Sequence, residues 1–82
     1  MTYLLDGNAI AGELFAAFGR EMTDVVGKCR NCGTVSVVAE LCVYLRAPGT
    51  VVRCPSCQAV VMVLVTIGDE CNVHLPALEF EQ

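Results

Sequence analysis

One short phrase occurs twice in this 82-residue chain, as KCRNCG at residues 28–33 and as RCPSCQ at residues 53–58. In each copy a basic residue precedes a cysteine, and a second cysteine follows after two further residues. Four sulfur atoms can surround one metal ion when the backbone within each pair turns tightly. The spacing therefore predicts a single tetrahedral metal site formed by Cys29, Cys32, Cys54 and Cys57.

The residues that flank these cysteines favour the thiolate form. Lys28, Arg30 and Arg53 adjoin two of the four cysteines, Cys29 and Cys54, and positive charge lowers a thiol pKa and offsets the charge of a four-thiolate site. Gly33 allows the left-handed backbone that such a turn needs, and Pro55 stiffens the second turn. These neighbours support metal binding more than contact with nucleic acid.

Tetrahedral sulfur coordination is typical of zinc or iron. We expect one structural Zn²⁺ per chain, because four cysteines close the coordination shell that a catalytic zinc keeps open. A mononuclear iron in the same site is the alternative, and two disulfides or a labile redox pair are the third reading.

The chain length and the first residues indicate which kind of cross-link the cysteines form and in which cellular compartment. A chain of this size predicts one domain, residues 1–82, with a small core that often needs a disulfide or a metal. The opening MTYLLDGNAI lacks the apolar run of a secretory signal, so we expect a cytoplasmic protein with reduced thiols. No apolar stretch approaches the roughly 18 residues of a membrane-spanning helix, and we expect no membrane partner.

The N-terminal segment predicts one short amphipathic helix over about 8–18. Asp6 or Asn8 can cap its start and Gly19 can end it. Gly12 inside the helix costs about 1 kcal/mol relative to alanine, so the helix must dock to be stable. Its apolar stripe recurs at helical spacing: Ile10, Leu14, Ala17 and Phe18.

A period-two pattern predicts a strand over 35–46, and residues 47–50, APGT, are typical of a type II turn. The strand over 35–46 leads away from the first cysteine pair and is much longer than the strand that leads from the turn to the second pair, although both pairs must meet at one point. The outgoing path must therefore bend near 39–40, so that 41–46 pairs with 50–54 as a hairpin.

The segment 59–67, AVVMVLVTI, is apolar at nearly every position, which predicts a strand covered on both faces. Either the N-terminal helix or a second copy of the chain would cover its second face. After a turn at 68–70, alternation over 71–75 predicts a last short strand. Residues 76–82 are interpreted as an acidic tail.

The two cysteine pairs, joined by a β-hairpin, resemble a zinc ribbon. With LDGNAIAGELFAAF at 5–18 and AELCVYLRAPGTVVRCPSC at 39–57, the chain is similar to a family of small bacterial zinc-ribbon proteins of unknown function. The resemblance implies a small α+β fold, with a rubredoxin-like antiparallel sheet over about 25–75 and one N-terminal helix.

The phrase CPxC also resembles rubredoxins, which bind one iron through four cysteines and carry electrons. This chain departs from that pattern, because Gln58 stands where rubredoxins have glycine and the chain contains no tryptophan. A rubredoxin-like iron electron carrier is therefore the alternative function.

The remaining candidate residues are Cys42, Cys71 and His74. We interpret both cysteines as small hydrophobic residues of the core. Cys71 and His74 are three residues apart on a strand and point to opposite faces, which disfavours a second metal site. His74 is expected to face solvent, and with a single histidine and no recognisable nucleophile setting we expect no enzyme.

The formal net charge is −4, and four thiolates that bind one divalent cation would make it more negative by two. This charge opposes affinity for phosphate backbones, so a nucleic-acid-binding ribbon is the lesser alternative. The sequence predicts a non-catalytic metal-binding module whose partner is an unidentified protein or a second copy of itself.

Overall fold

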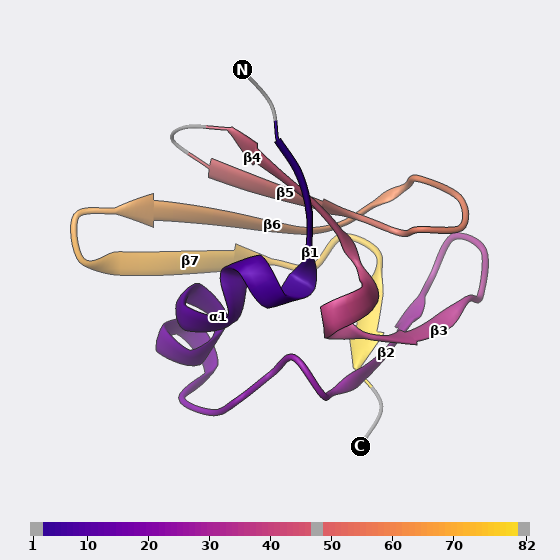
Figure 1. Cartoon of the computed structure of the whole chain (residues 1–82), viewed down its shortest axis with the longest axis horizontal. Helices are drawn as coiled ribbons and strands as arrows, with labels where there is room; N and C mark the ends of the chain where they lie inside the picture. The colour runs from indigo at the N-terminus through magenta and orange to yellow at the C-terminus, as the bar shows by residue number, and fades with distance from the viewer. Residues whose placement is uncertain (1–2, 47–48, 81–82) are drawn as a thin grey trace.

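The computed structural model describes residues 3–46 and 49–80 of the chain (Figure 1). The predicted turn at 47–50 falls in part on Ala47 and Pro48, which lie outside the described residues. The elements are β1 (Tyr3–Asp6), the 3₁₀ helix η1 (Gly7–Ile10), α1 (Ala11–Phe18), β2 (Val26–Cys29), β3 (Val35–Val37), the 3₁₀ helix η2 (Val38–Glu40), β4 (Cys42–Arg46), β5 (Gly49–Arg53), β6 (Val60–Ile67), β7 (Glu70–His74) and β8 (Leu78–Phe80).

Two antiparallel sheets form the protein. The larger has five strands in the order β1-β4-β5-β6-β7, and the smaller has three in the order β3-β2-β8. Helix α1 packs against the edge strand β7 (Figure 1). No helix in the described part of the chain is long and apolar enough to cross a membrane. The arrangement is a small α+β fold, as expected.

The predicted hairpin and its bend are confirmed. Strand β4 pairs with β5, with Val43 opposite Val52 and Arg46 opposite Gly49. The 3₁₀ helix η2 lies at the predicted bend and leads the chain from the smaller sheet into the larger one. The hairpin of β6 and β7 also forms, and Gly68 in its turn has a φ of 62°.

The N-terminal helix begins differently from the prediction. Its first turn is the 3₁₀ helix η1, where Asp6 Oδ1 accepts a hydrogen bond of 3.1 Å from the Asn8 amide. The α-helix proper follows, and Gly19 ends it with a φ of 73° and a 2.8 Å bond from its amide to Phe15 O. The predicted end of the helix is therefore confirmed, and its start is divided between two helix types.

Three short strands were not expected from the sequence. Strand β1 pairs with β4 and becomes an edge of the larger sheet. Strand β2, just before the first cysteine pair, pairs with both β3 and β8. Part of the expected acidic tail is strand β8, with Leu78 opposite Cys29 and Phe80 opposite Gly27.

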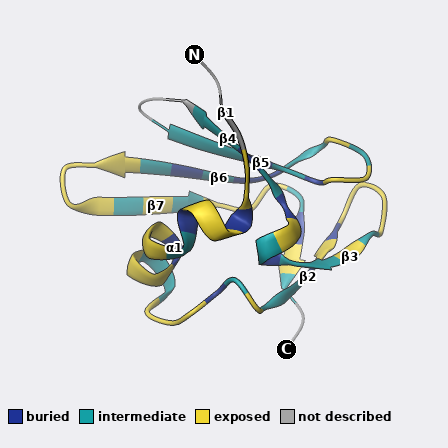
Figure 2. Cartoon of the chain, in the orientation of Figure 1, coloured by how far each residue is buried: buried dark blue, intermediate teal, exposed yellow. Residues whose placement is uncertain are grey.

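Along the C-terminal half of β6 the core lies on one face of the strand, whereas Val61 near its start is buried on the other face. Met62 and Leu64 are buried on the core face, whereas Val63 and Val65 are only half-buried and Ile67 is 67% exposed. Within one chain the C-terminal half of β6 is therefore covered on one face only (Figure 2), and cover of the second face by another copy of the chain stays a prediction. The core side chains are Ile10, Leu14, Met22, Cys29, Val38, Leu41, Val43, Val52, Cys54, Val61, Met62, Leu64 and Leu78.

Candidate metal centre

The four cysteines that the sequence singled out lie together. Cys29 ends β2 and Cys32 lies in the turn after it, while Cys54 follows β5 and Cys57 lies in the turn before β6. Their sulfur atoms are all within 4.8 Å of one another. The Cys29–Cys57 and Cys32–Cys54 sulfur pairs are each 3.7 Å apart. A tetrahedral ion with metal–sulfur bonds near 2.3 Å requires separations of about 3.8 Å, so the cluster can hold a metal ion.

The doubled phrase folds into two matching turns. The Gly33 amide donates to Cys29 O at 2.8 Å, and the Gln58 amide donates to Cys54 O at 2.9 Å. Both donors have left-handed backbone, with φ of 81° at Gly33 and 66° at Gln58. In Figure 1 the β2–β3 loop and the β5–β6 loop lie at the same end of the molecule. The repeated sequence thus produces a repeated backbone shape, which directs both sulfur pairs to one point.

Gln58 is the only non-glycine residue with positive φ in the described part of the chain, and its surroundings hold it there. Left-handed backbone costs such a residue about 1–2 kcal/mol. Tyr44 Oη donates to Gln58 Oε1 at 3.1 Å, and Arg53 Nη1 donates to Gln58 O at 2.8 Å. The Arg53 guanidinium also lies 5.7 Å from the centroid of the Tyr44 ring. Sequence reasoning missed this support, because it comes from the β4–β5 hairpin.

The thiols differ in their pKa because their surroundings differ. A hydrogen bond of 3.1 Å with the Thr34 hydroxyl lowers the pKa of the exposed Cys32 thiol to about 6. The Asn31 side-chain amide donates to Cys57 Sγ at 3.4 Å and lowers the pKa of Cys57. Burial raises the pKa of Cys54 to about 11. Above about pH 6 the exposed Cys32 is therefore already a thiolate when a metal ion binds, whereas the buried Cys54 must lose its proton.

Metal affinity is expected to fall as the pH falls, and to fall more steeply below about pH 6. Above that pH, Cys32 is already a thiolate while Cys54 still releases a proton on binding. Below it, Cys32 must release a proton too, so the slope of log affinity against pH should increase by about one. Zn²⁺ titrations across this pH range check the slope.

The variant Thr34→Val serves as the control for this pH dependence. It removes the hydroxyl that lowers the pKa of Cys32 and should move the change of slope toward the ordinary thiol value of about 8.5. A single slope through pH 6 in the unaltered protein would contradict the expectation.

The two cysteines outside the pairs do not join the cluster. Cys42 is half-buried on β4, opposite Arg53. Cys71 is half-buried and packs against the core, so the prediction of a packing role is confirmed for this residue. His74 is exposed, as expected. In the part of the chain that the structure describes, neither Cys71 nor His74 belongs to the candidate metal site.

The ligands divide equally between the two sheets. Cys29 and Cys32 are carried by the three-stranded sheet, and Cys54 and Cys57 are carried by the β5–β6 connection of the five-stranded sheet. Cys29 and Cys54 also belong to the buried core. A metal ion bound here would join the two sheets at one end of the core.

Comparisons with known proteins place the chain in a family. No curated protein and no solved structure matches it. A family model described as a family of unknown function (DUF6510) matches residues 1–81, a span that includes all four clustered cysteines. The chain belongs to this family of unknown function, DUF6510.

Proposed function

We propose that the protein is a non-catalytic, cytoplasmic binding module of the zinc-ribbon type, in which one structural Zn²⁺ joins two β-sheets. The observation that carries this proposal is the equal division of the four cysteines between the sheets, with all sulfurs within 4.8 Å. Four thiolates fill a tetrahedral shell and leave no position for a substrate or water. The metal would therefore stabilise the fold and take no part in a reaction.

The size of the core supports a structural role. A domain of 82 residues buries a smaller fraction of its surface than a larger one, and its stability margin is small. Two ligands, Cys29 and Cys54, are 3% and 1% exposed and lie within the core cluster. A metal held by these residues would cross-link the chain at the end of the apolar core. A cytoplasmic location would keep the four thiols reduced and able to bind it.

Native mass spectrometry of the untagged protein purified from its own host tests the metal. One zinc per chain is expected, together with a lower thermal midpoint after the metal is removed by a chelator. Metal-free protein with an unchanged midpoint would exclude the structural role.

For the binding role we propose a second copy of the chain as the partner, joined along β7. This strand is an edge of the five-stranded sheet, and unpaired edges readily add another strand. Antiparallel pairing of β7 with itself about Asn72 would place Glu70 opposite His74 of the second copy. A carboxylate opposite an imidazole is a favourable polar pair, and the strand contains no lysine or proline that would block the edge.

Analytical ultracentrifugation tests this association. The protein is expected to sediment as a dimer, and Glu70→Lys should weaken the dimer because a lysine on an edge strand opposes the addition of another strand. Asp69→Lys makes the same charge change in the adjacent exposed turn and should leave the dimer intact. A monomer at every concentration would refute self-association.

A mononuclear iron electron carrier is the second candidate, and hydrogen bonds to the sulfurs favour it. The Ser56 amide and the Asn31 side chain donate to Cys54 Sγ and Cys57 Sγ, each at 3.4 Å. Such bonds tune the reduction potential of iron–sulfur centres. Iron in the native mass spectrum, with absorbance in the visible range, would favour this function. A nucleic-acid-binding ribbon would instead require salt-dependent binding of a random oligonucleotide, which the net charge opposes.

A further inference from the structure

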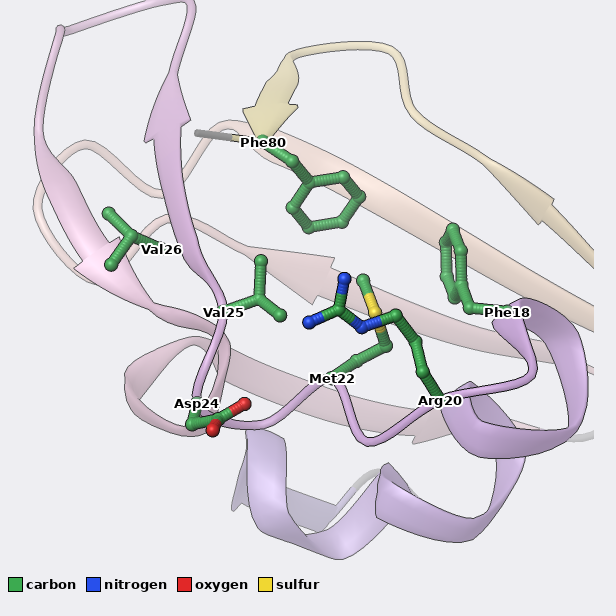
Figure 3. A pocket seen from close by; sticks show the side chains of 7 residues that line it. All are labelled: Phe18, Arg20, Met22, Asp24, Val25, Val26 and Phe80. Carbon is green, nitrogen blue, oxygen red and sulfur yellow. The ribbon is translucent and has the colours of Figure 1, made fainter. Parts of the chain in front are cut away.

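A cavity of about 830 Å³ lies between the end of α1, the loop that follows it and β8, away from the cysteine cluster (Figure 3). Its volume is within the range of about 300–1,000 Å³ that small-molecule sites occupy. It is lined by Phe18, Arg20, Met22, Asp24, Val25, Val26 and Phe80. Val26 begins β2 and Cys29 ends it, so the cavity and the candidate metal centre lie at opposite ends of one strand.

Five of the seven side chains that line this cavity are apolar. Two of the three phenylalanines of the chain, Phe18 and Phe80, meet there edge to face with ring centroids 5.7 Å apart. Figure 3 shows the two rings beside the cavity, with the side chain of Met22 between them and the loop. Met22 is buried and the two rings are half-buried, so each ring keeps surface that a ligand can cover. Aromatic surface of this kind binds aliphatic groups through burial of apolar area.

Arg20 supplies the polar end of the site. Its guanidinium projects among the apolar side chains and lies over Met22 in Figure 3, whereas the Asp24 carboxylate lies apart from it. A guanidinium presents a planar pair of donors that matches a carboxylate.

We propose that this cavity binds a small aliphatic carboxylate, with its apolar chain against Phe18 and Phe80 and its carboxylate on Arg20. The ligand is a small molecule because the cavity has the volume of a small-molecule site. It is an anion because the Arg20 guanidinium lies among the apolar side chains, apart from the carboxylate of Asp24, the one acid in the lining. The proposal is independent of the metal and of self-association.

Three small probes test the proposal on the metal-loaded protein by two-dimensional ¹H–¹⁵N NMR. Octanoate carries both the chain and the carboxylate, octanol carries the chain alone, and acetate carries the carboxylate alone. Octanoate is expected to shift the amides of residues 18–26 and of Phe80, and to bind about tenfold more tightly than octanol, because only octanoate pairs with Arg20. Acetate should bind more weakly than either.

The matched variants are Arg20→Gln and Arg46→Gln, which make the same charge change, the second on β4 of the five-stranded sheet. Arg20→Gln should reduce octanoate binding to the level of octanol and leave octanol binding unchanged. Arg46→Gln should leave both unchanged. Equal affinities of octanoate and octanol, an unaltered octanoate affinity in Arg20→Gln, or shifts confined to other parts of the protein would each overturn the proposal.

Discussion

Replacing Cys29 by serine is expected to abolish tight zinc binding and to lower the thermal midpoint by at least about 12 °C. Structural zinc contributes roughly 10 kcal/mol or more to the folding of small domains, and we expect a loss of at least about 3 kcal/mol when one ligand is removed. For a domain of this size each kcal/mol shifts the midpoint by about 4–8 °C. Circular dichroism melts with metal analysis of the same samples measure both effects.

Two controls separate metal loss from the loss of a buried side chain. Cys42→Ser removes a half-buried thiol outside the cluster and should change stability by about 0.5 kcal/mol or less. A chelator should lower the midpoint of the unaltered protein and have no further effect on Cys29→Ser. If Cys29→Ser melted at the unaltered midpoint, the structural metal would be refuted.

The candidate site could be predicted from the sequence because its geometry is mostly local. Two residues between the cysteines of a pair, with a turn residue after the second, determine how the sulfurs of that pair are placed. Only the meeting of the two pairs is long-range, and the shared phrase indicated it. The bend near 39–40 followed from the same condition, because the pairs could meet only if the longer strand turned.

The smaller sheet could not be predicted because its strands are short and far apart in the chain. Strand β2 has four residues and β8 has three, which is too few for a period-two pattern, whereas β3 lies within the predicted strand over 35–46. Their pairing depends on contacts such as Leu78 with Cys29, which join segments almost fifty residues apart. The pocket around Phe18 and Phe80 was missed for the same reason.

The burial of β6 shows a different limit. A continuous apolar run predicts a strand that is covered on both faces. It does not show whether the same chain has helices and strands long enough to cover them. Helix α1 has eight residues and packs on one side, so Val63 and Val65 remain half-buried. The composition of a strand shows how apolar it is. How far the strand is buried depends on the lengths of the elements that pack on it.

Gly7→Ala is expected to destabilise the protein by about 3 kcal/mol or more, through a contact that the sequence does not reveal. A Cβ atom at Gly7 would lie 1.9 Å from Val38 O and 2.7 Å from Val38 C. These are backbone atoms of η2, which cannot rotate away as a side chain can, so η1 and η2 would have to separate. That separation disturbs the segment that leads from one sheet to the other.

Gly12→Ala is the matched control, since it makes the same substitution five residues later in α1. A Cβ atom there meets nothing within 4 Å in the described part of the chain, and alanine is the better helix former. This variant should gain up to about 1 kcal/mol and melt about 5 °C higher. Urea unfolding of both variants measures the difference. Similar stabilities for the two would mean that η1 and η2 can move apart at little cost, and that the contact at Gly7 does not constrain the junction between the sheets.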